Sequence, residues 1–181
     1  LYKLDFRKVL DRHIEHKADI TIATTPVDQR SAQGFGIMQT NATGRITNFI
    51  EKPKEASVLK SLCMPAKTVK ELGLAEDQDH FEANMGIYIF NRDVLLEALD
   101  NNFADFGKDI IPQAIKNYHV QSYPFKGYWE DIGTIRSFYE ANLDLCAVVP
   151  KYDFFDSQAV IYTHARFLPA TKINGGSIRH A

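Results

Sequence analysis

The stretch FIEKP at residues 49–53 has the form of a strand that stops abruptly at charged side chains. A second stretch, YWEDIGT at residues 128–134, has the same form. In open α/β sheets, ligands bind at the ends of strands. A lysine–carboxylate pair at one strand end and an aspartate at another suit a phosphorylated, hydroxyl-rich ligand bound together with a divalent metal.

The sequence upstream of residue 53 predicts a helix, a strand and a hairpin. Residues 5–17 have apolar side chains at helical spacing. Residues 18–25 are rich in β-branched side chains and meet Pro26, which predicts a strand that ends before the proline. Residues 35–39 and 45–50 flank a turn that contains glycine, which predicts a β-hairpin.

The sequence downstream alternates between further strands and helices. Residues 85–90 are nearly continuous apolar sequence, as in a strand buried on both faces. Residues 108–116 predict a helix that tolerates Pro112 only near its first turn, and residues 119–125 predict a strand. Thr134 is placed to cap a helix over 135–148, with four apolar residues directed inward: Ile135, Phe138, Leu143 and Leu145.

Composition and charge limit the classes of protein to which the chain can belong. The 181 residues fit one domain with a short appendage, and the change of pattern after Val149 predicts a boundary there. The net charge of −2, without blocks of like charge, argues against a nucleic-acid or anionic-membrane surface. Two cysteines without metal-type spacing predict a reduced, cytoplasmic setting.

Glu51 and Lys52 are the first candidates for binding chemistry. Neighbouring residues of a regular strand point to opposite faces, so both can face one ligand only if the strand has ended. Pro53 supplies that break, because it cannot continue a ladder. A lysine there can bind a phosphate and a carboxylate can accept bonds from sugar hydroxyls. The alternative is a solvated ion pair worth at most about 1 kcal/mol.

Asp131 and Asn84 are the next candidates. Asp131 lies between Trp129 and an Ile-Gly pair, which predicts a partly apolar setting where a metal ion would be a suitable partner. It could instead cap the following helix. Asn84 precedes the apolar run and could donate to a ligand, although such residues are more often turn formers.

Five motifs in order resemble glucose-1-phosphate adenylyltransferase (ADP-glucose pyrophosphorylase): LYKLDF at 1–6, FIEKP at 49–53, NMGIYIF at 84–90, DFGKDIIP at 105–112 and GYWEDIGT at 127–134. Residues 161–172 resemble the segment that joins the catalytic domain of this family to its C-terminal left-handed β-helix. The resemblance covers essentially the whole chain, and it is closer to the plant and cyanobacterial style than to the enteric one.

The resemblance implies a fold and an activity. The fold is α/β, a Rossmann-like nucleotidyltransferase domain with a mixed, mostly parallel and here incomplete sheet over residues 1–149. Residues 150–181 would form the linker and the start of the β-helix. The activity is adenylyl transfer from ATP to glucose 1-phosphate, which gives ADP-glucose and pyrophosphate for glycogen or starch synthesis and uses Mg²⁺.

The resemblance also implies roles for individual residues. Lys52 and Asp131 would be catalytic, with Lys52 on the sugar phosphate and Asp131 on the metal. Glu51 would accept bonds from the sugar hydroxyls, and Gly36 and Asn84 would also lie in the substrate site. An allosteric anion site would include His164 and Arg166.

Two departures from the family pattern leave alternatives open. The family usually has serine where this chain has Asn84, so a regulatory, non-catalytic subunit is an alternative. The glycine-rich nucleotide loop and the first metal aspartate precede Leu1 in the family, so we expect a fragment that is inactive alone. A pyrophosphorylase for another sugar nucleotide is a further alternative. The family is tetrameric, as homo- or hetero-tetramers, and a plant protein would be plastidial.

Overall fold

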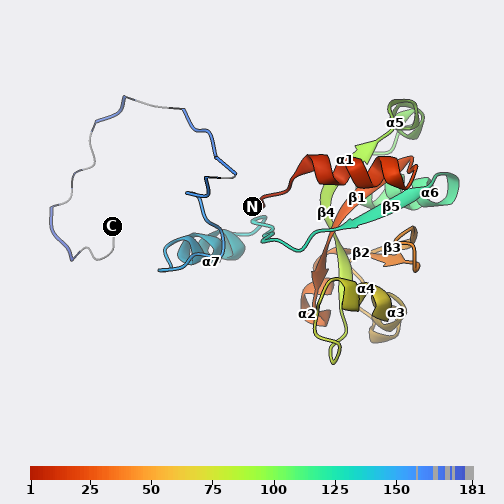
Figure 1. Ribbon diagram of the computed structural model, residues 1–181, viewed down its shortest axis with the longest axis horizontal. Coiled ribbons are helices and arrows are strands. Elements are labelled where there is room, and N and C mark those ends of the chain that lie inside the picture. Colours follow the sequence, from red (N-terminus) through yellow and green to blue (C-terminus); the bar gives the residue numbers. More distant parts are fainter. Residues whose placement is uncertain (158, 165–166, 170–171, 173, 178–181) are drawn as a thin grey trace. The chain divides into compact units, whose positions relative to one another are not determined.

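A computed structural model of the chain describes residues 1–157, 159–164, 167–169, 172 and 174–177 (Figure 1). These residues divide into two compact units. One unit is Leu4–Gly127, and the other joins Leu1–Lys3 to the chain from Tyr128 onward. No helix in these described ranges is long and apolar enough to cross a membrane.

The Leu4–Gly127 unit is built on a five-stranded sheet with the order β3-β2-β4-β1-β5. β5 runs parallel to β1, and the other three neighbouring pairs are antiparallel. The predicted mixed sheet is therefore confirmed, but the prediction that it is mostly parallel is wrong. The strands are β1 (Ile20–Val27), β2 (Gly36–Thr40), β3 (Ile46–Glu51), β4 (Phe81–Phe90) and β5 (Val120–Pro124).

The connections explain the strand directions. β2 and β3 form the predicted hairpin, and a short turn between neighbouring strands forces them to be antiparallel. β4 lies between β1 and β2 and runs opposite to both. Alternation of strands and helices along a sequence shows that crossovers exist, but it does not show where each returning strand inserts.

Seven helical segments surround the sheet: α1 (Phe6–Glu15), α2 (Gln29–Ala32), α3 (Ala56–Ser61), α4 (Ala66–Glu71), α5 (Arg92–Leu99), the π-helical turn η1 (Phe106–Ile110) and α6 (Ile111–Asn117) among the residues described up to 127. α1 begins after Asp5, whose carboxylate accepts from the backbone N–H of Arg7 at 3.0 Å. Pro112 lies in the first turn of α6, as predicted, although the π-helical turn η1 runs directly into α6 and already makes the preceding residues helical.

β1 differs from its prediction in where it ends, and β4 differs in where it begins and in its burial. β1 continues through Pro26 to Val27. This is tolerated because β5 pairs with β1 only as far as Thr24, so that the proline has β4 as its one strand neighbour. The last four residues of β4 are half-buried rather than buried on both faces. β2 pairs with β4 only at Glu82 and Ala83, so this end of β4 has β1 as its one strand partner within the described chain.

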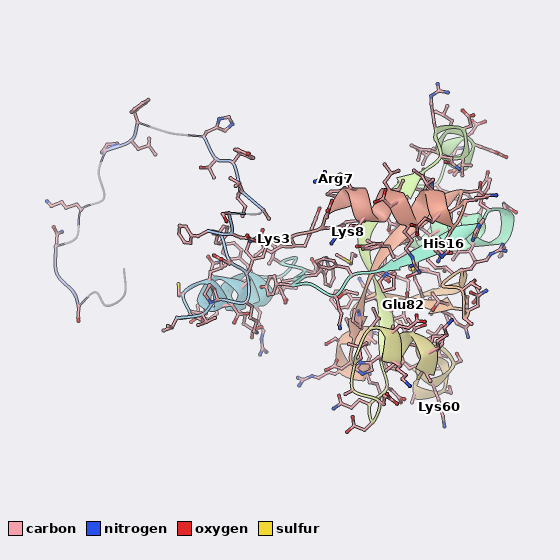
Figure 2. The ribbon with its side chains drawn as sticks, viewed as in Figure 1. Lys3, Arg7, Lys8, His16, Lys60 and Glu82 are labelled. Carbon is pink, nitrogen blue, oxygen red and sulfur yellow. The ribbon has the colours of Figure 1, made fainter. Side chains whose placement is uncertain are left out.

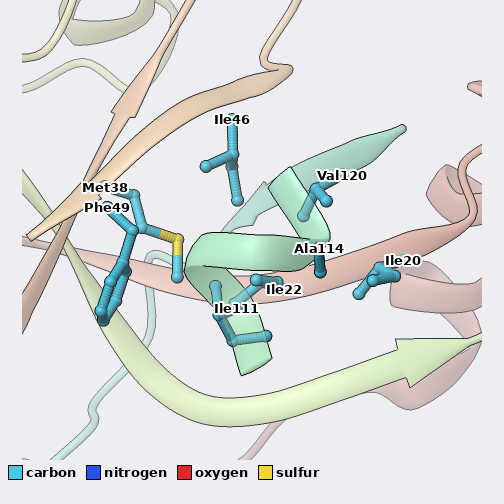
Figure 3. Packing of buried hydrophobic residues seen from close by; sticks show 8 residues of the cluster. All are labelled: Ile20, Ile22, Met38, Ile46, Phe49, Ile111, Ala114 and Val120. Atoms are coloured by element: carbon cyan, nitrogen blue, oxygen red, sulfur yellow. The ribbon is translucent and has the colours of Figure 1, made fainter. Parts of the chain in front are cut away.

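The sheet curls so that its two edges meet. The turn between β2 and β3 reaches β5, where the Ser122 N–H donates to the carbonyl of Gly44 at 2.9 Å. Gly44 has φ 78°, which favours glycine. The curl wraps α6, and Figure 3 shows the resulting core. This core contains Ile20, Ile22, Met38, Ile46, Phe49, Ile111, Ala114 and Val120.

The second unit holds α7 (Ile135–Leu145) and an antiparallel bridge between Tyr2 and Trp129. Thr134 caps α7 through a reciprocal pair of bonds with Ser137, as predicted. The predicted inward face of α7 is wrong: Ile135 is 90% exposed, and Ala141 is the buried residue of the helix.

After Leu145 the described residues form no helix or strand. The left-handed β-helix and the boundary at residues 149–150 therefore stay predictions.

Ile22→Ala should strongly destabilise the chain, because Ile22 is fully buried in the core around α6. Loss of a buried isoleucine side chain costs about 2–5 kcal/mol of unfolding free energy. The matched control is Ile14→Ala on α1, where the side chain is 63% exposed and the expected change is below about 0.5 kcal/mol. Urea denaturation of both variants measures the difference, and equal effects would contradict the assigned core.

Candidate functional site

Glu51 and Lys52 lie where β3 ends, as predicted. Glu51 is the last residue of β3, and Lys52 adopts the left-handed conformation with φ 48°. The Lys52 N–H donates to the Phe35 carbonyl at 3.0 Å, which fixes this turn. The Lys52 ammonium lies 3.8 Å from a Glu51 carboxylate oxygen. The break in the strand thus begins at Lys52 itself, one residue before Pro53, and brings both charged groups to one side.

Gly36 makes room for the Glu51 side chain. It pairs with Glu51 across the β2–β3 ladder. A Cβ atom added at Gly36 would lie 2.4 Å from the Phe49 ring and 2.7 Å from the Glu51 carboxylate. The role of Gly36 here is steric: it has no side chain to offer a ligand, and it lets the Phe49 ring and the carboxylate occupy this face.

A bulge in β4 positions Asn84. Along β1 the register passes directly from Ala23, opposite Ile87, to Thr24, opposite Asn84. Two β4 residues are therefore unpaired, and one of them, Gly86, has φ 73°. The Asn84 amide oxygen accepts from the Gly86 N–H at 2.9 Å, and its amide nitrogen donates to the Tyr88 hydroxyl at 2.8 Å. Asn84 is thus both a turn former and the partner of Tyr88.

Asp105 and Tyr88 join the same group of residues. The backbone N–H of Lys108 donates to the Asp105 carboxylate at 2.9 Å, and this bond, more than the nearby Lys108 and Lys52 charges, lowers the pKa of Asp105. The Tyr88 ring stacks on Phe106 at 5.6 Å between centroids. Burial, followed by the Glu51 and Asp105 charges, raises the pKa of Tyr88, so its hydroxyl stays protonated at neutral pH.

We call Glu51, Lys52, Asn84, Tyr88 and Asp105 the β3–β4 cluster. It combines one ammonium group and one carboxylate at the end of β3 with an amide and a phenol from β4 and a second carboxylate at the start of η1. The ammonium suits a phosphate, and the remaining groups suit neutral hydroxyls.

Sequence reasoning missed Tyr88 and Asp105 as site residues. Tyr88 reads as part of an apolar strand, and Asp105 reads as a residue before a helix. The one local signal for them was the Gly86 within the apolar run, since a glycine inside a strand often marks a bulge.

Asp131 belongs to the second unit, and its own surroundings are polar and solvated. The residue is exposed, so the predicted partly apolar setting is wrong. Its carboxylate accepts from the Gly133 N–H at 3.2 Å, a local turn rather than a cap of α7. The neighbouring Glu130 is less solvated, and this burial, followed by the Asp144 charge, raises the pKa of Glu130.

The metal-binding prediction rests on Asp131 alone. In the described part of the chain, no three His, Cys, Asp or Glu side chains are grouped to hold a metal. Mg²⁺ commonly uses one or two carboxylates together with water and substrate phosphates, so a single exposed aspartate fits that mode of binding. His164 is exposed, and Arg166 lies outside the described residues, so the allosteric site stays a prediction.

Gly36→Ala should destabilise the chain by about 1–3 kcal/mol, because the added methyl group must displace the buried Phe49 ring. Gly34→Ala is the matched control, since its nearest neighbour would be at an ordinary 3.4 Å. There we expect a change below about 1 kcal/mol. Urea denaturation compares the two, and a Gly36→Ala variant as stable as Gly34→Ala would mean that Phe49 moves freely.

Comparison with known protein families adds an independent finding. The family model described as nucleotidyl transferase matches residues 1–148. The matched range includes the whole sheet, the β3–β4 cluster and Asp131. The chain therefore belongs to the nucleotidyl transferase family.

Proposed function

We propose that this nucleotidyl transferase chain serves adenylyl transfer from ATP to glucose 1-phosphate, with ADP-glucose and pyrophosphate as products. The observation that supports it most directly is the β3–β4 cluster. The Lys52 ammonium group lies beside hydroxyl-binding carboxylate and amide groups, and this combination suits a phosphorylated sugar. The resemblance of five sequence motifs to ADP-glucose pyrophosphorylase supplies the particular sugar and nucleotide.

The reaction assigns a task to each group in the cluster. A phosphate oxygen of glucose 1-phosphate attacks the α-phosphorus of ATP. The bond from that phosphorus to the oxygen bridging the α- and β-phosphates breaks, and pyrophosphate leaves with this oxygen. Lys52 holds the attacking phosphate, and Glu51 orients the sugar through its hydroxyls. Catalysis of this kind is mostly positioning and charge stabilisation.

Mg²⁺ is the proposed cofactor, and Asp131 is the residue that would hold it. When bound, the ion would neutralise charge on the reacting phosphates. The proposal extends to an allosteric anion site at His164 and Arg166, to a homo- or hetero-tetramer, and to a cytoplasmic or plastidial location.

A regulatory, non-catalytic role is the second candidate, and Asn84 is the observation that favours it. Both ends of its amide are already hydrogen-bonded, to Gly86 and Tyr88, so it has less capacity for a sugar hydroxyl. The two candidates are separated by assaying pyrophosphate release alone and then in the presence of a catalytic partner subunit.

Lys52→Met should raise the KM for glucose 1-phosphate by about 10-fold or more, because a charge-assisted bond to phosphate is worth about 1.5–3 kcal/mol. The assay is pyrophosphate release by the full-length protein with ATP, glucose 1-phosphate and Mg²⁺. Lys54→Met is the control, since Lys54 is also exposed and lies two residues further on. A KM unchanged by Lys52→Met would make Lys52 a structural residue.

Asp131→Asn should remove nearly all turnover, because the amide keeps the size of the side chain but loses the charge that attracts Mg²⁺. The same assay is run over a range of Mg²⁺ concentrations. Asp77→Asn, at another exposed aspartate, should leave the rate unchanged. A normal rate in Asp131→Asn at low Mg²⁺ would exclude the metal role.

A further inference from the structure

A pocket lies in the Leu4–Gly127 unit, lined by residues outside the β3–β4 cluster. Its volume is about 520 Å³, within the range of small-molecule sites. It is bounded by α1, α4, the β2–β3 turn and the end of β5. Figure 2 shows two of its lining residues, His16 directly after α1 and Glu82 on β4. The proposed function does not use this pocket.

Glu82 is a buried carboxylate that lines the pocket, and it is only 1% exposed. Its oxygens accept from three hydroxyl groups, those of Thr24 at 3.0 Å, Thr40 at 2.8 Å and Ser122 at 2.5 Å. Within the described chain no Lys, Arg or His lies at ion-pair distance from it. Buried carboxylates are normally paired with a cation, so three neutral donors leave its charge without a direct counterion.

Arg12 supplies the opposite charge at the same pocket. It is half-buried, and its Nε donates to the Ser122 carbonyl at 2.7 Å. Its guanidinium has no carboxylate within ion-pair distance in the described ranges. The pocket is also lined by Lys67 and by a second glutamate, Glu71. Their charged groups lie 3.7 Å apart and form an ion pair.

One residue therefore separates two unpaired opposite charges. Ser122 bonds to Arg12 through its carbonyl and to Glu82 through its hydroxyl. A ligand that satisfies both charges must carry a cation and an anion only a few bonds apart. We propose that this pocket binds an α-amino acid, with the ammonium group on Glu82 and the carboxylate on Arg12.

Other ligand classes fit the pocket less well. A nucleotide or sugar phosphate would bring several negative charges toward the buried Glu82 carboxylate. A divalent metal could satisfy Glu82, but it would leave the Arg12 guanidinium at the same pocket without an anion. An α-amino acid meets both charges, and its side chain would extend along Leu72, Tyr123 and Pro124.

The test is calorimetric titration of the full chain with individual α-amino acids, among them glycine and the L-forms of alanine, glutamate and lysine. We expect at least one to bind with a Kd of about 1 mM or tighter. Its N-acetyl derivative lacks the ammonium charge and its amide lacks the carboxylate, so each should bind at least about 10-fold more weakly. The proposal is overturned if no amino acid binds, or if both derivatives bind as well as the parent.

Glu82→Gln places the site, because it keeps the size of the side chain and one of the two acceptor oxygens but removes the charge. It should raise the Kd of the amino acid that binds by about 10-fold or more. Glu71→Gln should change that Kd less than about 2-fold, because the Glu71 carboxylate is already paired with Lys67. Circular dichroism checks that both variants fold. If Glu82→Gln does not fold, Arg12→Gln is titrated in its place. Unchanged binding in the folded variant would place the amino acid elsewhere and overturn the assignment.

Discussion

The bulge in β4 is the constraint on which the candidate site depends. In a regular strand, residues four apart are separated by about 13 Å, too far for their side chains to share a hydrogen bond. Asn84 and Tyr88 are four apart, yet their side chains meet at 2.8 Å. The bulge explains this, because their β1 partners Thr24 and Ile22 are only two residues apart. Two extra residues are thus absorbed without turning either side chain to the other face.

The bulge also separates two chemical environments along one strand. Before it, Glu82 is buried among hydroxyl groups between β1, β2 and β5. After it, Tyr88 stacks on Phe106 beside Asp105. A single central strand therefore contributes to two different polar groups, one enclosed by the curled sheet and one at its edge. The family match covers both, but the reaction proposed above requires only the second.

The features that were predictable from sequence are the ones set by local chemistry. Thr134 caps its helix, Pro112 lies in the first turn of α6, and the turn containing Gly44 closes a hairpin, because each depends on a few neighbouring residues. The end of β3 at Glu51 belongs to the same class. Strand direction and order do not, since the insertion of β4 between β1 and β2 depends on contacts between residues far apart in sequence. Tyr88 was missed for the same reason.

The left-handed conformation of Lys52 has a consequence for how this chain tolerates change. A side chain with a Cβ atom in that region costs about 1–2 kcal/mol relative to glycine. Glycine at position 52 would relieve this strain and would also delete the ammonium group beside Glu51. Selection of variants for thermal stability alone would therefore enrich glycine here and deplete the one basic group of the cluster. Position 52 is a point where optimising the fold and preserving the site act in opposite directions.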